Sequence, residues 1–304
     1  MTEPPENLEQ LPATPGAPRQ VLSVEVTLAA GDPDNAPDVL AARSGLSRLR
    51  IKDAMAKGAV WLARAGRKPE RLRRVKTPLK PGDRLNLYYD SAVLALVPPQ
   101  ATLVVDARRY SVWNKPAGLL CEGSRFGDHA TLAAQVAAHF TPRREVYLVH
   151  RLDLEASGLI VIAHSRQATA RLSALFQARS VDKRYRIEVL GDLRPLGVRG
   201  RIDLPLDGKV ASTEYAVEAY REEDNRSIAH VRMLSGRYHQ IRRHFEALGH
   251  PVIGDPRYGR GNKDAGGLRL AAVGIAFEDP WNGRPVRLGD VPEWQTTANS
   301  IPAT

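Results

Sequence analysis

The sequence predicts an α+β protein: a large domain with a mainly antiparallel or mixed sheet flanked by helices, preceded by a small αα-β basic domain. Three observations predict this class. Between residues 103 and 277 several strand-like stretches follow one another directly, without the regular strand and helix alternation of a parallel α/β sheet. An Asn282-Gly283 pair, which favours a tight hairpin turn, comes shortly after them. Ahead of residue 100, two short helical patterns precede a strand, which is typical of a separate module.

The first part of the chain divides into a tail and the small domain. Residues 1–20 contain five prolines and no periodicity, so we expect a disordered tail there. Residues 37–96 form the expected small domain, and Pro98-Pro99 begins the linker that follows it. Its expected elements are two helices and, after a basic turn segment, a strand: Val39–Gly45, Arg48–Lys57 and Arg84–Tyr89.

The second domain is expected over residues 101–295. Alternating and β-branched apolar stretches predict strands at Leu103–Val105, Tyr110–Asn114, Val146–His150, Gly158–Ala163, Arg184–Leu190, Ser212–Ala219, Ile228–Leu234 and Leu268–Phe277. Helical periodicity predicts helices at His129–Phe140, Arg166–Ala178 and His239–Leu248.

Composition limits the classes of protein that the chain can be. With 304 residues, 43% of them hydrophobic and 26% charged, it can bury a core, which excludes wholesale disorder. The single cysteine, Cys121, cannot form an internal disulfide or a Cys-rich zinc site. No apolar stretch approaches the roughly 18 residues of a membrane span, and the first residues lack the pattern of a signal peptide. We therefore expect a soluble cytoplasmic protein that does not contact a membrane.

The positive charge is concentrated in one segment. The chain has a net charge of +10, and residues 38–90 alone hold 14 Lys and Arg against five Asp and Glu. The rest of the chain holds 30 basic and 29 acidic residues, so the small domain carries nearly all of the excess. A solvated basic face without a partner is the alternative, but the density of one cluster favours nucleic acid. That cluster consists of Arg64, Arg67, Lys68, Arg71, Arg73, Arg74 and Lys76.

One acidic residue stands out by its position. Asp153 lies in a short polar link between the apolar strands predicted before His150 and after Gly158. A carboxylate on a loop held by rigid neighbours is well placed for catalysis. By itself this is weak evidence, because an Asp in a turn usually serves the turn.

Five sequence blocks, in one order and covering about residues 108–290, resemble the RluA-type RNA pseudouridine synthases. They are Asn114-Lys-Pro-Ala-Gly118, His150-Arg-Leu-Asp153 with Ser157-Gly-Leu159, Lys183-Arg-Tyr185, Gly236-Arg-Tyr-His-Gln-Ile-Arg242 and Gly249-His-Pro-Val-Ile-Gly254-Asp255 with Tyr258-Gly259. The basic domain resembles, more loosely, the alpha-L (S-four-like) RNA-binding domain often fused ahead of these enzymes, through Gly45-Leu-Ser-Arg48 and Lys80-Pro-Gly-Asp83.

The chain departs from the family pattern at three places. Leu154-Glu155-Ala156 stands where Arg-Asp-Thr is usual, and Tyr238 stands where Thr is usual. Leu270-Ala271-Ala272 lacks the His often found in that strand. These departures bear on substrate preference more than on catalysis.

The resemblance implies an isomerase that converts uridine in RNA to pseudouridine, with Asp153 as the catalytic carboxylate. Arg242 matches the Arg that pairs with this Asp, and a forked guanidinium would keep a buried carboxylate ionised. Tyr185 matches an active-site aromatic, which offers a stacking surface for a flipped uracil. Glu155 would point away from Asp153 if the backbone is extended, which makes it a poor second acid and favours an isomerase over a nucleosidase.

Cationic residues in the matching blocks and in the basic domain are candidates for contacts with RNA phosphates. They are Lys115, Arg151, Lys183 and Arg237 in the larger domain, and Arg48, Arg67, Lys68, Arg71, Arg73 and Arg74 in the smaller one. We interpret His150 and His239 as structural. No metal, nucleotide or other organic cofactor is indicated, because His239 and His244 have the wrong spacing for a zinc pair and Gly261–Gly267 lacks the context of a phosphate loop.

Two other functions remain open on the residues alone. A noncatalytic RNA-binding protein with the same fold would be expected to lack Asp153 or Arg242, and both are present. An RNA N-glycosidase would release free uracil. The expected partner in each case is structured RNA, either ribosomal or transfer RNA, bound by a monomer.

Overall fold

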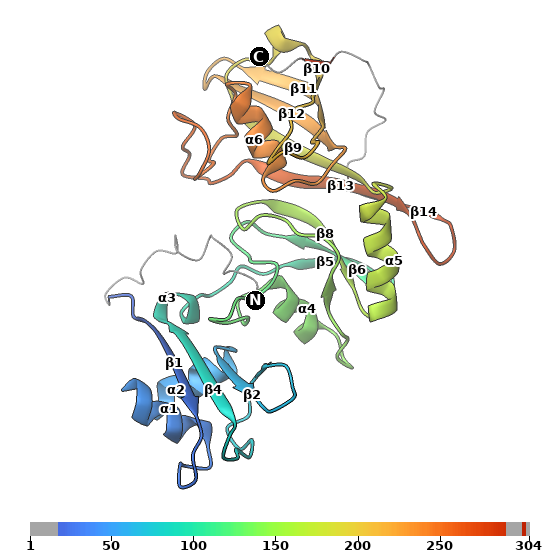
Figure 1. The fold of residues 1–304 in the computed structure, drawn as a ribbon. Helices are drawn as coiled ribbons and strands as arrows, with labels where there is room; N and C mark the ends of the chain where they lie inside the picture. Colours follow the sequence, from blue (N-terminus) through green and yellow to red (C-terminus); the bar gives the residue numbers. More distant parts are fainter. Residues whose placement is uncertain (1–17, 290–299, 302–304) are drawn as a thin grey trace. The chain divides into compact units, whose positions relative to one another are not determined.

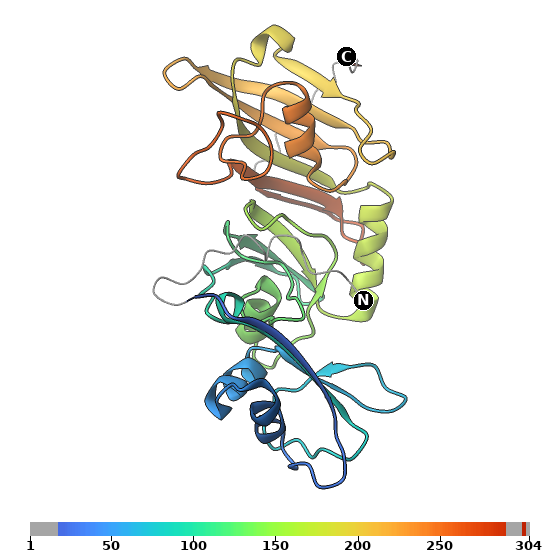
Figure 2. The ribbon, with the colours of Figure 1, turned by 60° about the vertical axis from the view of Figure 1, so that its left-hand side comes forward.

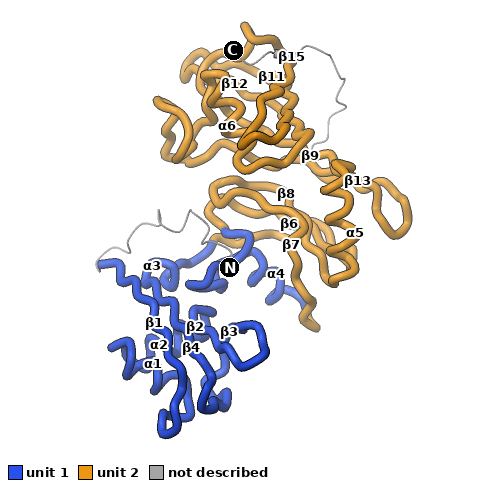
Figure 3. The backbone as a smooth tube through the Cα atoms, viewed as in Figure 1, with its two compact units in different colours: residues 1–98, 120–140 blue, residues 99–119, 141–304 orange. Residues whose placement is uncertain are grey.

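The structure is a computed structural model that describes residues 18–289 and the backbone of residues 300–301 (Figure 1). Contacts divide the chain into two compact units (Figure 3). Unit 1 comprises residues 1–98 and 120–140, and unit 2 comprises residues 99–119 and 141–304. The tail predicted over residues 1–20 lies almost entirely outside the described residues, as does the end of the second predicted domain.

Unit 1 is a four-stranded sheet with helices, in the strand order β1-β4-β2-β3. Its strands are β1 (Val21–Thr27), β2 (Val60–Ala63), β3 (Glu70–Arg71) and β4 (Arg84–Asp90). Its helices are α1 (Ala36–Ser44), α2 (Arg48–Ala56), α3 (Ser91–Leu94) and α4 (Leu132–His139). Asn35 and Ser47 cap the first two helices with their side chains, and Gly45 ends α1 in the left-handed conformation.

Strand β1 extends the small domain beyond its predicted start at residue 37. It pairs with β4 in an antiparallel register from Val21 opposite Asp90 to Thr27 opposite Arg84. The signal was present, because Leu22, Val24 and Val26 alternate along the strand and pack on the core of unit 1.

Residues 120–140, which we assigned to the second domain, are grouped with unit 1 in the structure. The backbone N–H of Asp128 donates to the carbonyl of Lys57 at 3.0 Å. The indole N–H of Trp61 donates to the carbonyl of Arg125 at 3.1 Å. The loop before α4 is thus fastened to the small sheet by contacts that a sequence pattern does not reveal.

Unit 2 is built on a mixed sheet with the strand order β15-β10-β11-β12-β9-β13-β8-β6-β5, with β14 paired to β13 and β7 to β8. Strand β8 pairs in parallel with β13, as does β10 with β15. The strands are β5 (Thr102–Asp106), β6 (Tyr110–Lys115), β7 (Tyr147–Leu148), β8 (Ser157–Ala163), β9 (Asp182–Leu190), β10 (Arg199–Ile202), β11 (Thr213–Arg221), β12 (Arg226–Met233), β13 (Leu270–Glu278), β14 (Pro285–Gly289) and β15 (Ser300–Ile301).

Two helices cover this sheet. Helix α5 (Arg166–Gln177) packs on β7 and β8, and α6 (Gln240–Ala247) packs on β11 (Figure 2). Ile241 and Phe245 of α6 are buried in a core with Tyr185 of β9 and Tyr215 of β11. The α+β class with a mixed, mainly antiparallel sheet is confirmed.

The elements predicted for the second domain differ from the observed ones mainly at their ends. The hairpin indicated by Asn282-Gly283 is confirmed, since the pair lies between β13 and β14 with Gly283 at φ +68°, but the connection spans residues 279–284 and is not a tight two-residue turn. The helix predicted from His129 begins at Leu132, because the Thr131 side chain accepts from the Ala134 N–H as an N-cap. The strand predicted up to His150 ends at Leu148, where the chain leaves the sheet for the loop that carries Asp153. Strand β10 was not predicted, since its sequence has no apolar alternation.

Candidate active site

A pocket of about 680 Å³ lies in unit 2, a size typical of small-ligand sites. Its walls come from the loop before β8, from α5, from β9 and from the segment that enters α6. The structure brings most of the predicted site residues of the larger domain to this pocket: Arg151, Asp153, Lys183, Tyr185, Arg237 and Arg242.

Asp153 lies in a loop that backbone hydrogen bonds hold in place. The Ala156 N–H donates to the Asp153 carbonyl at 3.2 Å, which closes a turn. The Leu154 carbonyl accepts from the Gly118 N–H at 2.8 Å. Just beyond the turn, Gly158 has a φ of +112°, and a side chain there would lie 2.2 Å from the Ala272 carbonyl oxygen. Glycine at this position therefore allows β8 to approach β13 closely, directly after the loop that carries Asp153.

Lys115 does not contact phosphate, contrary to the prediction. Its side chain is fully buried, and its ammonium donates to the carbonyls of Leu119 at 2.9 Å and Leu154 at 3.2 Å. The ammonium thus bonds the carbonyl of the residue next to Asp153. The Lys115 ammonium therefore helps to hold the loop that carries Asp153.

Arg242 is the buried centre of the site, with 1% of its surface exposed. Its guanidinium makes two hydrogen bonds to Asp255, from Nε at 2.7 Å and from Nη2 at 2.8 Å. Nη1 donates to Oδ2 of Asp153 at 3.1 Å. Burial alone would lower the pKa of Arg242, but the bonds and charge of Asp255 and then of Asp153 raise it above its ordinary value. Arg242 therefore stays charged and holds Asp153 in one orientation.

Asp255 was quoted in the sequence blocks but given no role, and the structure makes it the anchor of Arg242. It is fully buried and also accepts from the backbone N–H groups of Arg257 at 2.8 Å and Tyr258 at 2.9 Å. Burial would raise the pKa of Asp255, but the bonds from Arg242 and the backbone lower it overall. An acid in the resembling block without an assigned partner was the only available signal.

His239 is a positioning residue, which agrees with its interpretation as structural. It adopts the left-handed conformation at φ +50°, directly before α6. Its Nε2 lies 3.1 Å from Nη1 of Arg242 and its Nδ1 lies 3.1 Å from the Tyr258 hydroxyl. Because the guanidinium can only donate, Nε2 accepts and the imidazole is neutral. Burial lowers the pKa of His239 to about 4, which keeps that form at neutral pH.

Glu155 does not point away from the site, contrary to the expectation for an extended backbone. The turn at Asp153 redirects the chain, and Oε2 of Glu155 lies 3.6 Å from Nη1 of Arg242. That oxygen is buried without a hydrogen-bond partner. Glu155 is absent from the pocket wall, so it adds negative charge around Arg242 without reaching the space for a substrate.

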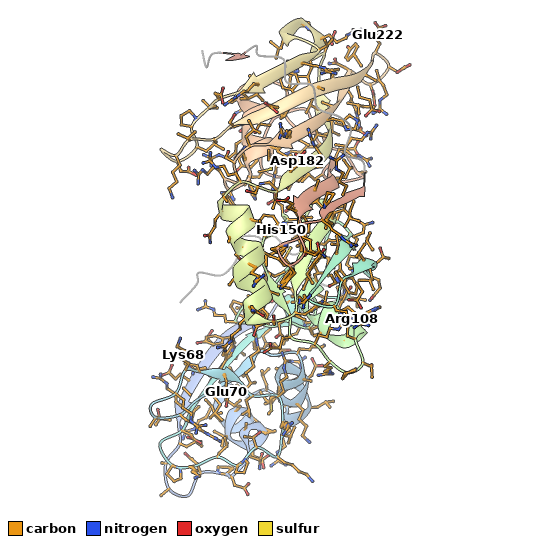
Figure 4. The ribbon with its side chains drawn as sticks, turned by 90° about the vertical axis from the view of Figure 1, so that its right-hand side faces the viewer. Lys68, Glu70, Arg108, His150, Asp182 and Glu222 are labelled. Atoms are coloured by element: carbon orange, nitrogen blue, oxygen red, sulfur yellow. The ribbon has the colours of Figure 1, made fainter. Side chains whose placement is uncertain are left out.

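Tyr185 and Lys183 lie on the same face of β9 and line the pocket. Burial, and then the negative charge of Asp153, raise the pKa of Tyr185 above its ordinary value, so the phenol is neutral. Burial lowers the pKa of Lys183. His150, also on the wall, stacks on Phe176 with 4.5 Å between ring centroids, and burial lowers its pKa to about 3. It is labelled in Figure 4.

Comparison with known proteins identifies the family. A sequence model described as RNA pseudouridylate synthase matches residues 109–247. An uncharacterized RNA pseudouridine synthase of Aquifex aeolicus is 30% identical over 236 residues, which cover 70% of this chain and 72% of the relative. The chain belongs to the RNA pseudouridine synthase family. The dual-specificity RNA pseudouridine synthase RluA of Escherichia coli is 36% identical over 162 residues, 48% of this chain and 72% of that protein.

Solved structures agree on the fold. The human RNA pseudouridylate synthase domain containing 1 superposes with a TM-score of 0.54 at 23% identity, covering 64% of this chain and 86% of that chain. The human RNA pseudouridylate synthase domain containing 4 superposes with a TM-score of 0.50 at 21% identity, covering 63% of this chain and 88% of that chain. These structures support the fold, and the sequence relatives identify the chain as an RluA-type RNA pseudouridine synthase, an isomerase that acts on RNA.

In this pseudouridine synthase, two of the predicted phosphate ligands of the basic domain are occupied by protein. Arg73 donates to Asp128 at 2.6 Å, and Arg71 lies 3.2 Å from the same carboxylate. Arg71 also donates to the carbonyls of Gly58 and Ser124 and stacks over Trp61 at 4.4 Å. These two arginines hold the loop before α4, so each guanidinium already has a partner within the protein, and their contact with RNA stays a prediction.

Four other cations of the predicted cluster are exposed, as is Arg73. Arg67 and Lys68 are on the exposed loop between β2 and β3, where Lys68 is labelled in Figure 4. Arg74 and Lys76 are exposed shortly after β3. Arg48 is exposed and forms an ion pair with Asp38. The exposed cations of the predicted cluster therefore lie on the β2–β3 loop and on the segment after β3.

Within residues 18–289 no cluster of His, Cys, Asp and Glu could hold a metal ion. None of the helices described is long and apolar enough to cross a membrane.

Proposed function

We propose that Asp153 is the catalytic carboxylate and that the pocket receives a uridine flipped out of structured ribosomal or transfer RNA. The observation that carries this proposal is the Asp255–Arg242–Asp153 chain of hydrogen bonds at the pocket wall. A carboxylate at an anomeric centre can act as nucleophile or electrostatic partner only when it is ionised. Arg242, whose charge is balanced and whose side chain is oriented by Asp255, donates to Oδ2 of Asp153 and so holds that carboxylate in place at the pocket.

The isomerisation needs a base that stays in place while its bond changes. The bond from the ribose to the ring nitrogen breaks, the uracil turns, and a new bond forms to a ring carbon. That carbon then loses a proton, and the freed nitrogen takes one up, so the reaction is balanced without a co-reactant. Tyr185 supplies a buried aromatic surface for the uracil, and stacking on such a ring stabilises a base by about 1–3 kcal/mol.

The test uses purified protein and total RNA from cells that lack the gene. Pseudouridine is mapped chemically, and free uracil is measured in the same reaction. The wild type should form pseudouridine at specific positions and release no uracil. Asp153→Asn should form none while its RNA affinity stays within about tenfold, because the change removes only the charge. Asp106→Asn, a surface variant in the same unit, serves as the control and should keep full activity.

Two outcomes would contradict the proposal. Substantial turnover by Asp153→Asn would remove the carboxylate from its catalytic role. Free uracil in place of pseudouridine would instead support an RNA N-glycosidase.

We further propose that Arg67, Lys68, Arg74 and Lys76 form the RNA-backbone surface of the basic domain. Their support is exposure together with a common location around the β2–β3 loop. Replacing all four by Gln should reduce the slope of log affinity against log salt by roughly 0.7–0.9 for each phosphate that the protein no longer neutralises. The matched control is Arg71→Gln with Arg73→Gln, which should lower the stability of unit 1 and leave the salt slope unchanged. Equal salt slopes in the wild type and in both variants would show that these four cations do not contact RNA phosphates.

We also propose that the protein works as a monomer in the cytoplasm, without contact with a membrane. Its support is that the chain has a single cysteine, the buried Cys121, so the fold depends on no internal disulfide and suits a reducing compartment. Light scattering of the purified chain and fractionation of cells test the two statements separately.

A further inference from the structure

Tyr238 is an aromatic side chain at the surface of the pocket. It lines the pocket wall, yet 49% of its surface is exposed. Among the large hydrophobic side chains that the described residues leave exposed, it is the one aromatic. An aromatic ring that is half exposed on a pocket wall is available to stack on a flat group of a bound ligand.

The Tyr238 ring is held in one orientation by its neighbours. It stacks on the imidazole of His239, with 3.7 Å between ring centroids and 21° between planes. Its hydroxyl accepts from Nη1 of Arg257 at 3.3 Å. The turn beneath it is closed by the Arg237 N–H, which donates to the Gln240 side chain at 3.1 Å. A ring ordered in advance loses little conformational entropy when a second flat group stacks on it.

This stack continues into the catalytic centre. The imidazole below Tyr238 meets the Tyr258 ring edge-on, at 5.5 Å and 89°. The same imidazole accepts from Arg242, which holds Asp153. Ring stacking on His239 and the hydrogen bonds of Arg242 therefore connect the Tyr238 ring to Asp153 and fix the position of the ring relative to that carboxylate.

Positive charge accompanies the ring. Arg237 precedes it on the pocket wall, and the guanidinium of Arg257 lies 5.9 Å from its centroid. An aromatic surface with cations beside it matches the chemistry of a nucleotide, whose base is flat and whose phosphates are anionic. Neither feature would be expected around a ring that binds an apolar peptide.

We propose that Tyr238 is a stacking platform for the nucleobase next to the target uridine, and that it makes this enzyme prefer a purine at that position. The inference rests on the proposed function of the pocket, in which the flipped uracil occupies the space beside Tyr185. The neighbouring base loses its stacking partner when the uridine leaves the helix, and the Tyr238 ring replaces that partner. A purine presents the larger surface and so gains more from stacking.

The experiment is a double-mutant cycle between the ring and the base. The RNA probes are three hairpins with one loop uridine flanked by adenosines: one intact, one with the 5′ neighbour abasic and one with the 3′ neighbour abasic. The dissociation constant and the rate of pseudouridine formation are measured for the wild type and for Tyr238→Ala. The wild type should lose roughly 5- to 100-fold in affinity with one of the two abasic hairpins. Tyr238→Ala should show the same loss with the intact hairpin and no further loss with that abasic one.

Two further variants separate stacking from other roles of the side chain. Tyr238→Phe keeps the ring and should behave as the wild type with all three hairpins. Tyr220→Ala removes a ring in the same unit whose hydroxyl bonds Asn225 away from the pocket wall, and it should leave every constant unchanged. If Tyr238→Phe is as impaired as Tyr238→Ala, the hydroxyl and not the ring matters, and the proposal is overturned.

The affinity readout keeps this inference distinct from the proposed function. Equal sensitivity of the wild type and Tyr238→Ala to the abasic hairpins would overturn the stacking platform, whether or not pseudouridine forms. Coupling in the dissociation constants of a protein that forms no pseudouridine would support the platform and contradict the proposed catalysis.

Discussion

Replacing Asp255 by asparagine measures how strongly a buried ion pair holds the active-site arginine. The side chains of Arg242 and Asp255 are 2% and 0% exposed and share two hydrogen bonds. In Asp255→Asn, Oδ1 can keep its three donors, but an amide N–H₂ replaces the oxygen that accepts from Nε. One charge-assisted bond is removed, and the buried guanidinium loses its nearest counter-charge.

The expected cost follows from this geometry. Breaking a buried pair by removing one partner destabilises proteins by about 3–5 kcal/mol. Asp153 still compensates part of the Arg242 charge from 3.1 Å, so we expect the low end, about 3 kcal/mol. Turnover should fall by up to roughly 100-fold, because Arg242 no longer aims Asp153, while RNA affinity should change little.

Hydrogen exchange of the α6 backbone amides is the assay, since it reports local opening within one unit of a chain that has two. Asp106→Asn is the matched control. Asp106 makes the same two-bond contact with Arg144, at 2.6 and 2.9 Å, but the two side chains are 32% and 28% exposed. Exposed pairs contribute about 0–1 kcal/mol. A loss of stability for Asp255→Asn no larger than that of the control would refute the reasoning.

Three further outcomes are expected. Asp128→Asn should raise RNA affinity, because Arg71 and Arg73 lose the carboxylate that neutralises them, yet lower the stability of unit 1 by about 1–2 kcal/mol in urea unfolding; a fall in both would contradict this. Lys115→Met should lower kcat at unchanged RNA affinity, because the loop that carries Asp153 loses a hydrogen bond; a weaker RNA affinity would instead support the predicted contact of Lys115 with a phosphate. The pKa of His150 is about 3 when folded and near 6.5 when unfolded, so the unfolded chain binds the extra proton between these values. Stability should therefore fall by about 1.4 kcal/mol per pH unit below pH 6.5, a slope that His150→Gln should remove from acid unfolding curves.

Much of the architecture could be predicted from the sequence, because it depends on neighbours along the chain. The alternation in Arg184–Leu190 and Ile228–Leu234, and the Asn282-Gly283 turn, are local signals, and the structure confirms each. The position of Asp153 between two strands is equally local. Its pairing with Arg242 needed the family resemblance, since 89 residues separate the two.

Only the tertiary structure decided which charged side chains face a substrate and which face the protein. Lys115 and Arg71 look like phosphate ligands in the sequence, but their partners are a loop carbonyl at Leu154 and a carboxylate at Asp128. Glu155 turns toward Arg242 because of the loop that presents Asp153. The sequence states the charge of a residue, whereas its solvation and its partner depend on segments far away in the chain. For that reason the family and its chemistry could be predicted from the sequence, whereas the contacts that hold Asp153 and Arg242 in place could not.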